Sequence, residues 1–409
     1  MIKSTSHNLN HSNTNKLDNY FYFCKEYRRY SLALLDYFWN NKISYKIKEK
    51  NLFFNIASND FEIPSMMSTT SIDISTDISA RAQKCAMTQV LGCLKSSTMK
   101  RKKQLFVLNN YDLKPNKREK LLKKTKKPLT KPDLSKLNPE LNSICATFEV
   151  ASGHFNGFLK LSSLGNKYGK IFLPIKFHKN NQKLKDWQMK TSFCLKNQSI
   201  DIRWEKDFSL KNEGTIVGAD SGVNSIVTLS APQPIKSLKP ILQKLSRKIK
   251  GSKSFRRAQD ERTNFINYTI NLLNFSEIKQ INLEDVKQLR YKQSSSRFLS
   301  HFTYPAIRQK IVSRCEEHGV RVLLTASPFK SQRCSVCGWV QKKNRKGEKF
   351  NCLDCGHSAN ADANSAINQT IFLPSVYHLL KSGLNREGFF WTPSGIYDRF
   401  GQELAVPDL

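Results

Sequence analysis

The chain has 409 residues, and its 67 Lys and Arg residues outnumber its 33 Asp and Glu residues, which gives a formal net charge of +34. A protein with this much positive charge repels itself unless it binds a polyanion, so the composition favours a nucleic-acid partner. Hydrophobic residues make up 39% of the chain, which is enough for ordered cores in two to four domains, but no apolar run reaches the ~18 residues of a membrane span.

The first third of the chain is predicted to be helical and basic. Residues 1–17 are polar and rich in Asn and Ser, and we expect them to be disordered. Residues 18–138 contain apolar positions at helical spacing, which predicts helices at about 17–42 and 77–95. Residues 100–131 hold 13 Lys or Arg and only two acids. A stretch this one-sided favours contact with phosphates over a merely solvated face.

Residues 139–208 change character and contain about five short β-rich runs separated by Gly, Asn and Lys turns. Short strands at ~10-residue spacing predict a small β-barrel. Its basic strand residues could hold a nucleic-acid backbone, although a solvated face explains them nearly as well; they are Lys160, Lys176, Arg203 and Lys206.

Two apolar strands in residues 209–329 are predicted to end on acids. Thr215–Asp220 reads as a buried strand, followed by a turn and a second strand at 225–229. A basic helical stretch is expected at 235–275, and its residues Lys244–Arg262 are a second candidate for phosphate contact. The next strand, from residue 278, ends on Glu284 and Asp285. A helix at 301–318 and a strand at 320–324 complete the pattern.

Four cysteines have the spacing of a structural zinc site. Cys334 and Cys337 form one C-x₂-C pair and Cys352 and Cys355 form another. Tetrahedral Zn²⁺ takes four thiolates from two such tight turns. A glycine directly follows each pair, at 338 and 356, and can adopt the turn that directs amide groups toward sulfur. Scattered cysteines elsewhere and the absence of a signal peptide indicate a reducing, intracellular compartment.

Asp362 follows the second cysteine pair at an expected helix start. If that helix packs against the neighbouring ends of the two strands, Asp220, Glu284 and Asp362 converge. Carboxylates this close repel one another unless Mg²⁺ neutralises them. Two such ions can activate a water and stabilise the leaving oxygen of a phosphodiester. Strand alternation turns Asp285 away from this group.

Four segments together resemble the RuvC motifs and zinc ribbon of the TnpB family, the transposon-encoded ancestor of the miniature type V CRISPR effectors. The similarity is clear over residues 214–370, and the last segment is the most specific. The segments are Gly218-Ala219-Asp220-Ser221-Gly222-Val223-Asn224, Ile281-Asn282-Leu283-Glu284-Asp285-Val286, Ser331-Gln332-Arg333-Cys334-Ser335-Val336-Cys337-Gly338, and the run from Cys352 through Asp362 and Asn364 to Asn368.

The resemblance implies a multidomain α+β protein with a RuvC-like nuclease domain of RNase H fold, an inserted zinc ribbon, a helical recognition lobe and a small β-barrel wedge domain. Asp220, Glu284 and Asp362 match the family's catalytic, magnesium-binding acids, and the four cysteines match its zinc ligands. The implied divisions are a disordered segment (1–17), the lobe (18–138), the wedge (139–208), the first two nuclease motifs (209–329), the ribbon (330–358), the third motif (359–370) and a tail without an assigned role (371–409).

The resemblance also implies the activity, an RNA-guided DNA endonuclease with two catalytic Mg²⁺ ions and one structural Zn²⁺. Its partners would be a guide RNA and a double-stranded target DNA with a short flanking motif. The protein would be cytoplasmic and bound to the nucleoid through DNA, or nuclear in a eukaryote. A guide-dependent repressor without cleavage is the main alternative, and it would not need the three acids. A transposon-associated accessory protein is a second alternative. A zinc-ribbon transcription factor leaves about 300 residues unexplained, and a DNA-joining transposase is less favoured still.

Overall fold

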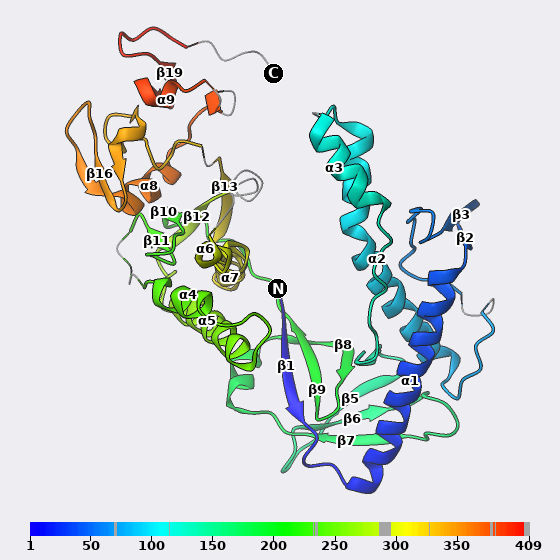
Figure 1. The fold of residues 1–409 in the computed structure, drawn as a ribbon. Coiled ribbons are helices and arrows are strands. Elements are labelled where there is room, and N and C mark those ends of the chain that lie inside the picture. The colour runs from blue at the N-terminus through cyan, green and yellow to red at the C-terminus, as the bar shows by residue number, and fades with distance from the viewer. Residues whose placement is uncertain are drawn as a thin grey trace. The chain divides into compact units, whose positions relative to one another are not determined.

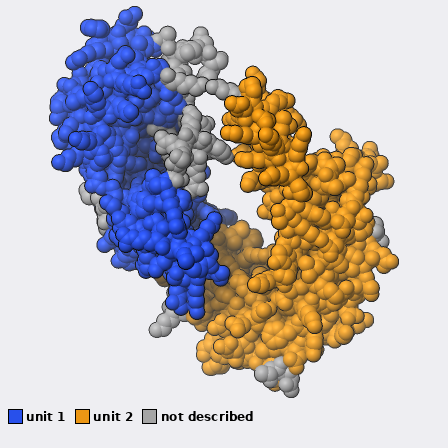
Figure 2. Space-filling model, in the orientation of Figure 1, with its two compact units in different colours: residues 1, 207–409 blue, residues 2–206 orange. Residues whose placement is uncertain are grey.

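The computed structural model divides the chain into two compact units (Figure 2), one of residues 2–206 and the other of residues 207–409 with residue 1. This boundary lies close to the one expected after residue 208. None of the helices in the described ranges is long and apolar enough to cross a membrane. The structure describes residues 1–68, 72–113, 115–231, 233, 236–285, 296–326, 328–376, 379–380 and 382–404.

In the first unit (Figure 1) the first helix lies close to its expected position, the second continues well past its expected end at residue 95, and a third follows that was not among the two predicted. These helices are α1 (Thr14–Asn40), α2 (Ala80–Asn110) and α3 (Pro115–Lys126), with a hairpin of β2 (Ile43–Ile47) and β3 (Lys50–Phe54) between α1 and α2. α1 packs on α2, and the Tyr27 hydroxyl of α1 donates to Gln89 Oε1 of α2 at 3.1 Å. The fully buried Tyr20 of α1 instead donates its hydroxyl to the Lys196 carbonyl at 2.6 Å. The Ser79 hydroxyl accepts the Ala82 amide N–H at 3.2 Å and so caps the start of α2.

The basic stretch at residues 100–131 forms the end of α2 and all of α3. Its described Lys and Arg residues are exposed with one exception. Arg101 is 6% exposed, and its guanidinium donates to Asn59 Oδ1 at 2.8 Å and to the Thr125 carbonyl at 2.6 Å. Arg101 therefore joins the two helices. Lys123 pairs with Glu119 at 2.6 Å and Lys131 pairs with Asp36, and the remaining basic residues in the described part of this stretch are exposed to solvent.

The expectation that residues 1–17 are disordered is wrong. β1 (Ile2–Asn8) pairs antiparallel with β9 along its whole length, from Ile2 opposite Glu205 to Asn8 opposite Ser199. An apolar pattern is missing here because β1 is built mostly of Ser, Thr, His, Lys and Asn. Trp204 Nε1 donates to Thr5 Oγ1 at 2.8 Å, so polar contacts as well as the backbone ladder hold this strand.

The strands expected at 139–208 form two sheets. One has the order β1-β9-β8-β4, and the other has the order β5-β6-β7. The predicted strands are present with small shifts of their ends, and β1 is an addition to them. Their bounds are β4 (Glu140–Leu141), β5 (Ala146–Val150), β6 (Gly157–Leu161), β7 (Ile171–Ile175), β8 (Gln188–Leu195) and β9 (Ser199–Glu205), with a 3-10 helix at Lys179–Leu184.

A four-stranded sheet forms the centre of the second unit, in the order β11-β10-β12-β13. β10 runs antiparallel to β11 and parallel to β12, which is parallel to β13. β10 has the bounds predicted from sequence, whereas β11 is shorter than expected. The four strands are β10 (Thr215–Asp220), β11 (Thr228–Leu229), β12 (Ile278–Glu284) and β13 (Arg321–Thr325).

Helices cover one face of this sheet with a single apolar core, to which β10 contributes Val217 and Ala219 and β12 contributes Ile281 and Leu283. The single helical stretch expected at 235–275 is two helices, because the chain turns at Gly251 (φ 87°) and Ser252 caps a new helix. Residue 235 itself lies outside the described ranges. The helices after β11 are α4 (Lys239–Ser246), α5 (Lys253–Asn271), α6 (Arg297–Ser300) and α7 (Tyr304–Glu317).

The opposite face of the sheet carries α8 (Ala361–Thr370), which packs on β10 and β12. The approach is so close that a Cβ placed on Gly218 would lie 1.9 Å from the Ala366 carbonyl oxygen. Glycine at 218 is therefore required by the contact between the strand and helix backbones. This contact fixes the height of α8 above the sheet.

The cysteine segment and the C-terminal tail fold together. The tail strand β18 (Phe389–Thr392) pairs with β14 (Trp339–Val340), which directly follows the first cysteine pair, and β19 (Gly395–Tyr397) pairs with β18. A second small sheet contains β15 (Arg345–Lys346), β16 (Lys349–Asn351) and β17 (Ser358–Asn360). A 3-10 turn at Lys342–Asn344 and the short α9 (Leu384–Glu387) complete the region. The tail is thus a structural part of the ribbon.

The contact at Gly218 gives a test of the fold. Gly218→Ala should lower the free energy of unfolding by about 1–3 kcal/mol, because overpacking forces α8 away from β10. The measurement is denaturant unfolding of the purified protein. Gly222→Ala is the control, since its nearest new contact would be an ordinary 3.4 Å to the Ser225 carbonyl. Equal stability of the two variants would contradict the role given to the close approach.

Candidate metal centres

Asp220 and Glu284 lie side by side at the ends of β10 and β12. The parallel register pairs Ala219 with Leu283, so the next residues in each strand are Asp220 and Glu284. Both side chains belong to the face that carries α8, because side chains alternate along a strand. Two positions earlier in β10, Gly218 faces α8. Two positions earlier in β12, Asn282 Nδ2 donates to the Gln369 carbonyl of α8 at 2.8 Å.

Asp362 lies in the first turn of α8, at the end of the helix near Asp220. The Asn360 side chain caps this helix, and its Oδ1 accepts the amide N–H groups of Asp362 at 2.9 Å and Ala363 at 3.1 Å. The helix start expected at Asp362 is therefore confirmed. Asn360, two residues before Asp362, serves as the N-cap of this helix. A Cβ placed on Gly222, in the turn after β10, would lie 3.8 Å from Asp362 Oδ2.

Burial raises the pKa of Asp220 to about 6, and the negative charge of Asp362 adds to the effect. The Ser221 amide N–H donates to Asp220 Oδ1 at 3.0 Å and Arg345 opposes the rise, but neither cancels it. A carboxyl group in this state holds its proton more firmly than in water. The ionised form of Asp220 is therefore unfavourable in the metal-free protein, mainly because the carboxyl group is buried.

Arg345 is a site residue that the sequence did not reveal. It comes from β15 of the ribbon, and its Nη2 lies 2.9 Å from Asp362 Oδ1. A cavity of about 520 Å³ opens beside this pair and is lined by Asp362, Arg345, Gln332 and Asn224 among others. Four other basic residues lie between the two cysteine pairs, at 342, 343, 346 and 349, so sequence alone could not select Arg345.

Asp285 is bound to α7, on the other side of the chain from Glu284. Its Oδ1 lies 3.3 Å from Arg308 Nη1, whereas the carbonyl oxygen of Glu284 accepts the Tyr304 hydroxyl. Within the described residues, the three acids Asp220, Glu284 and Asp362 do not gather their carboxylate oxygens as tightly as the cysteines gather their sulfurs. The strand register and the packing of α8 bring the three acids to one place. To bind the same metal ions, their carboxylate oxygens would have to move closer to one another.

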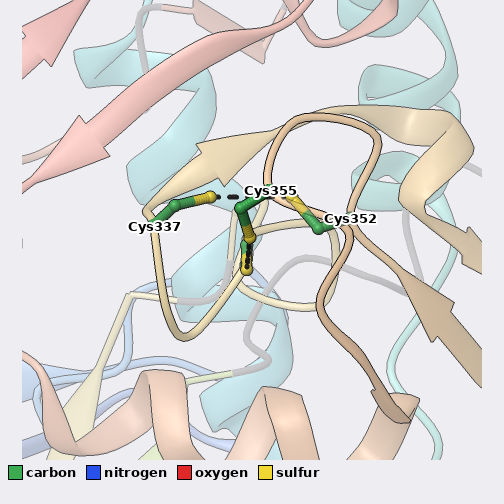
Figure 3. A group of neighbouring side chains, drawn as sticks. Cys337, Cys352 and Cys355 are labelled. Carbon is green, nitrogen blue, oxygen red and sulfur yellow. Dashed lines mark hydrogen bonds between the residues drawn. The ribbon is translucent and has the colours of Figure 1, made fainter.

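The four cysteines form a cluster with the dimensions of a zinc site (Figure 3). Their sulfur atoms lie within 4.8 Å of one another, with Cys334 Sγ 3.7 Å from Cys355 Sγ and Cys337 Sγ 3.6 Å from Cys352 Sγ. Four sulfurs at the ~2.3 Å zinc–sulfur distance in a tetrahedron are ~3.8 Å apart. The donor set and spacing therefore fit Zn²⁺.

Both cysteine turns have the glycine conformation that was predicted. Gly338 has φ 85° and Gly356 has φ 71°, values that favour glycine. The Gly338 amide N–H donates to the Cys334 carbonyl at 3.1 Å, and the Gly356 amide N–H donates to the Cys352 carbonyl at 3.1 Å. The two turns are thus equivalent, as expected for two halves of one metal site.

Two asparagines of α8 bind the first cysteine turn. Asn364 Oδ1 accepts the Ser335 amide N–H at 3.0 Å, and Asn364 Nδ2 donates to the Arg333 carbonyl at 2.8 Å. Asn368 also donates to the Arg333 carbonyl, at 2.7 Å, and accepts from the buried Arg333 guanidinium. The helix that carries Asp362 is therefore joined directly to the zinc ribbon.

Part of this chain is similar in sequence to known proteins. The sequence model of the family described as "Cas12f1-like, TNB domain" matches residues 304–369. The CRISPR-associated endodeoxyribonuclease Cas12f1 of Sulfoacidibacillus thermotolerans is 38% identical over 105 residues, which are 25% of this chain and 24% of that protein. InsQ of Escherichia coli (strain K12), named as an RNA-guided DNA endonuclease, is 26% identical over 210 residues, 41% of this chain and 52% of InsQ.

These matches confirm the resemblance inferred from the motifs: the chain is related to TnpB-like proteins and to the miniature type V effectors. The aligned segments span at most about half the length of these two relatives. Among solved structures, that of Alicyclobacillus acidoterrestris C2c1 in complex with single-guide RNA covers 100% of this chain and 94% of that one, with a TM-score of 0.50 and 7% sequence identity. That similarity concerns the fold alone.

The cysteine cluster predicts about one tightly bound Zn²⁺ per chain. Cys334→Ser and Cys355→Ser should each release the metal and unfold the ribbon, because zinc binding to such sites contributes about 10–16 kcal/mol. Metal analysis and the rate of zinc release to a chelator measure this. Cys93→Ser, a half-buried thiol in α2, is the control and should retain zinc. Folded wild-type protein without zinc would contradict the assignment.

The raised pKa of Asp220 predicts how stability depends on pH. The shift from the ordinary value of 3.8 to about 6 corresponds to about 3 kcal/mol. The folded, metal-free protein binds this proton more tightly than the unfolded chain does, so stability falls as pH rises between about 4 and 6. Asp220→Asn should therefore stabilise metal-free protein by up to about 3 kcal/mol at pH 7.5, and by about half of that at pH 5.

Denaturant unfolding at the two pH values in EDTA measures this effect. Asp285→Asn is the matched control and should give no gain, since it loses the ion pair with Arg308. A variant Asp220→Asn that is less stable than wild type at pH 7.5 would show that the carboxylate is satisfied in the metal-free protein.

Proposed function

We propose that the protein is an RNA-guided DNA endonuclease that hydrolyses phosphodiester bonds of a double-stranded target at Asp220, Glu284 and Asp362. The observation that carries the proposal is the convergence of two strand ends and the start of α8 on one face of the sheet. Relatives named as RNA-guided or CRISPR-associated DNA endonucleases support it. In this proposal residues 209–329 and 359–370 form the RuvC-like domain, and residues 18–138 and 139–208 form the recognition lobe and wedge.

The three acids suit divalent cations with oxygen ligands. Carboxylates are the ligands that Mg²⁺ prefers, and the raised pKa of Asp220 is what a site lacking its counter-charge shows. Two Mg²⁺ ions bound by Asp220, Glu284 and Asp362 would supply an activated water and a counter-charge for the leaving 3′ oxygen. The side chains of β10 and β12 would provide the shared ligands, and α8 would bring the third.

Arg345 has two successive roles in this proposal. In the metal-free protein its guanidinium neutralises Asp362. When a cation takes over that carboxylate, the guanidinium becomes free to donate to a phosphate oxygen of the DNA strand in the cavity beside it. The zinc ribbon, joined to α8 by Asn364 and Asn368, holds Arg345 and Asp362 in one rigid part of the molecule.

In this proposal the exposed basic surfaces bind the backbones of the guide RNA and the DNA. On α2 and α3 the Lys and Arg residues other than Arg101 are exposed in the described part of residues 100–131. In the Lys244–Arg262 stretch, Lys244 is paired with Glu261 and Arg262 donates to the His301 carbonyl, which leaves Arg247, Lys250, Lys253, Arg256 and Arg257 exposed. These residues would grip backbones, while base pairing to the guide would select the sequence.

The cleavage test uses the protein with its co-purified RNA and a duplex matched to that RNA. Asp220→Ala, Glu284→Ala and Asp362→Ala should each abolish cleavage in Mg²⁺, because each removes a metal ligand. Arg345→Ala should slow cleavage by about 10²–10³-fold, the typical cost of losing one donor that stabilises a transition state. Asp285→Ala is the control and should be much milder, because Asp285 pairs with Arg308.

Binding of the same duplex, measured by gel shift in EDTA, should change little in all of these variants. An Asp220→Ala protein that still cuts would refute the site. Wild-type protein that binds guide and target in Mg²⁺ but never cuts would favour the repressor.

A further inference from the structure

A second cavity lies on the face of the sheet that carries the acids. It has a volume of about 410 Å³ and is bounded by the sheet, by the chain just after α8 and by the tail. Ile216 of β10, Asn282 of β12 and Thr325 of β13 line its sheet side. Thr325 is the register partner of Glu284, so one wall of the cavity continues directly to a proposed metal ligand. A volume of this size suits a small ligand.

Lys330 lies in the wall of this cavity, and the charge of Glu284 acts on it without forming an ion pair with it. It is 4% exposed, and its ammonium has no hydrogen bond or ion pair with the residues that the structure describes; only its backbone carbonyl is used, by Asn368. Burial and the charge of Arg333 lower the pKa of Lys330 to about 8, against an opposing effect of Glu284. The group is thus still mainly protonated at pH 7, and a buried cation without a partner destabilises the fold.

A second buried donor nearby also lacks an acceptor. Gln369, at the end of α8, is 1% exposed, and its Oε1 accepts from Thr325 Oγ1 in the cavity wall. Its Nε2 has no acceptor among the described residues. The other amides of the wall satisfy one another, since Gln280 Nε2 donates to Asn282 Oδ1 at 2.8 Å and Asn282 donates to the Gln369 carbonyl. Gln369 is not among the described residues that line the cavity, whereas Lys330 is, so the Lys330 ammonium is the donor that an anionic acceptor in the cavity would satisfy.

The remaining walls are apolar, and an aromatic ring stands at the rim. Ile216, Leu323 and Leu373 line the cavity together with the tail residue Trp391. Phe372, which also lines it, is 88% exposed. An exposed ring next to a cavity containing a cation is the combination that holds a nucleotide of a single strand, by stacking on the base and by charge on the phosphate.

We propose that this cavity binds one nucleotide of the single-stranded DNA that leads to the acids, with its phosphate on Lys330 and its base on Phe372. The proposal rests on the proposed endonuclease function and specifies how that site holds its substrate. The DNA phosphate would form the ion pair that the Lys330 ammonium lacks with the described residues. The tail has a role here too, since Trp391 closes the cavity on the side away from the sheet.

The test compares Lys330→Met and Phe372→Ala with the control Lys343→Met, an exposed lysine of the ribbon. In EDTA, binding of a short fluorescent single-stranded DNA to the full-length protein with its RNA should weaken roughly tenfold in Lys330→Met and in Phe372→Ala. The double variant should lose little more than either single variant, because both residues hold the same nucleotide. Lys343→Met should bind as the wild type does.

Stability distinguishes a binding role from a structural one. Lys330→Met should have an equal or higher melting temperature than wild type, because it removes a buried charge without a partner. A lower melting temperature together with unchanged DNA affinity would overturn the proposal, and so would an equal loss of affinity for an RNA strand of the same sequence. Binding is read in EDTA without cleavage, so wild-type protein that never cuts would refute the endonuclease while a loss of binding in Lys330→Met would still support the nucleotide pocket.

Discussion

The contact of α8 with β10 is the constraint on which the candidate site depends. Gly218 has no side chain, so the helix backbone lies directly on the strand. The same helix carries Asp362 at its start and binds the zinc ribbon through Asn364 and Asn368. A single short helix therefore sets both the position of the third acid relative to the sheet and the position of the ribbon relative to the acids. Any group added between strand and helix would shift all of these together.

This face of the sheet keeps charges that the protein does not neutralise by itself. Asp220 has a raised pKa because it is buried near Asp362, and Lys330 is a buried cation without a partner in the described chain. Both are unfavourable for folding, and both become favourable once a ligand of opposite charge is present. In the proposed function the ligands are metal ions for the acids and a DNA phosphate for the lysine. These charges make the fold less stable at the face where ligands are expected to bind. Helices on the opposite face of the sheet supply a large apolar core.

The sequence predicted the strands that are strongly apolar and missed those that are not. Thr215–Asp220 was located to the residue because a buried parallel strand reads as a continuous apolar run. The cysteine cluster followed from ligand spacing, and the start of α8 at Asp362 followed from its place after the ribbon. β1 was missed because its side chains are mainly polar and its stability comes from pairing with β9. The tail was missed because its strands have only four and three residues, which is too short for a periodic pattern.

Charged site residues were the hardest to predict, for a reason of geometry. The three acids could be selected because each follows a recognisable element. Arg345 is one of several basic residues in a loop-rich ribbon, and only the fold shows which of them reaches Asp362. Lys330 has neighbours in sequence that give no hint of burial, because the walls around it come from three strands and from the tail.

The pairing of the tail with the ribbon has a consequence for how the protein is made. The Trp391 amide N–H donates to the Gly338 carbonyl at 3.0 Å, and the Arg333 guanidinium donates to the Trp391 carbonyl at 2.7 Å. Asp220 leaves the ribosome long before these residues do, whereas the ribbon sheet cannot be completed until β18 has been synthesised. The nascent chain thus carries an unfinished site from the synthesis of Asp220 until that of β18. The acids and their supporting ribbon can be assembled only after the strand that pairs with β14 has left the ribosome.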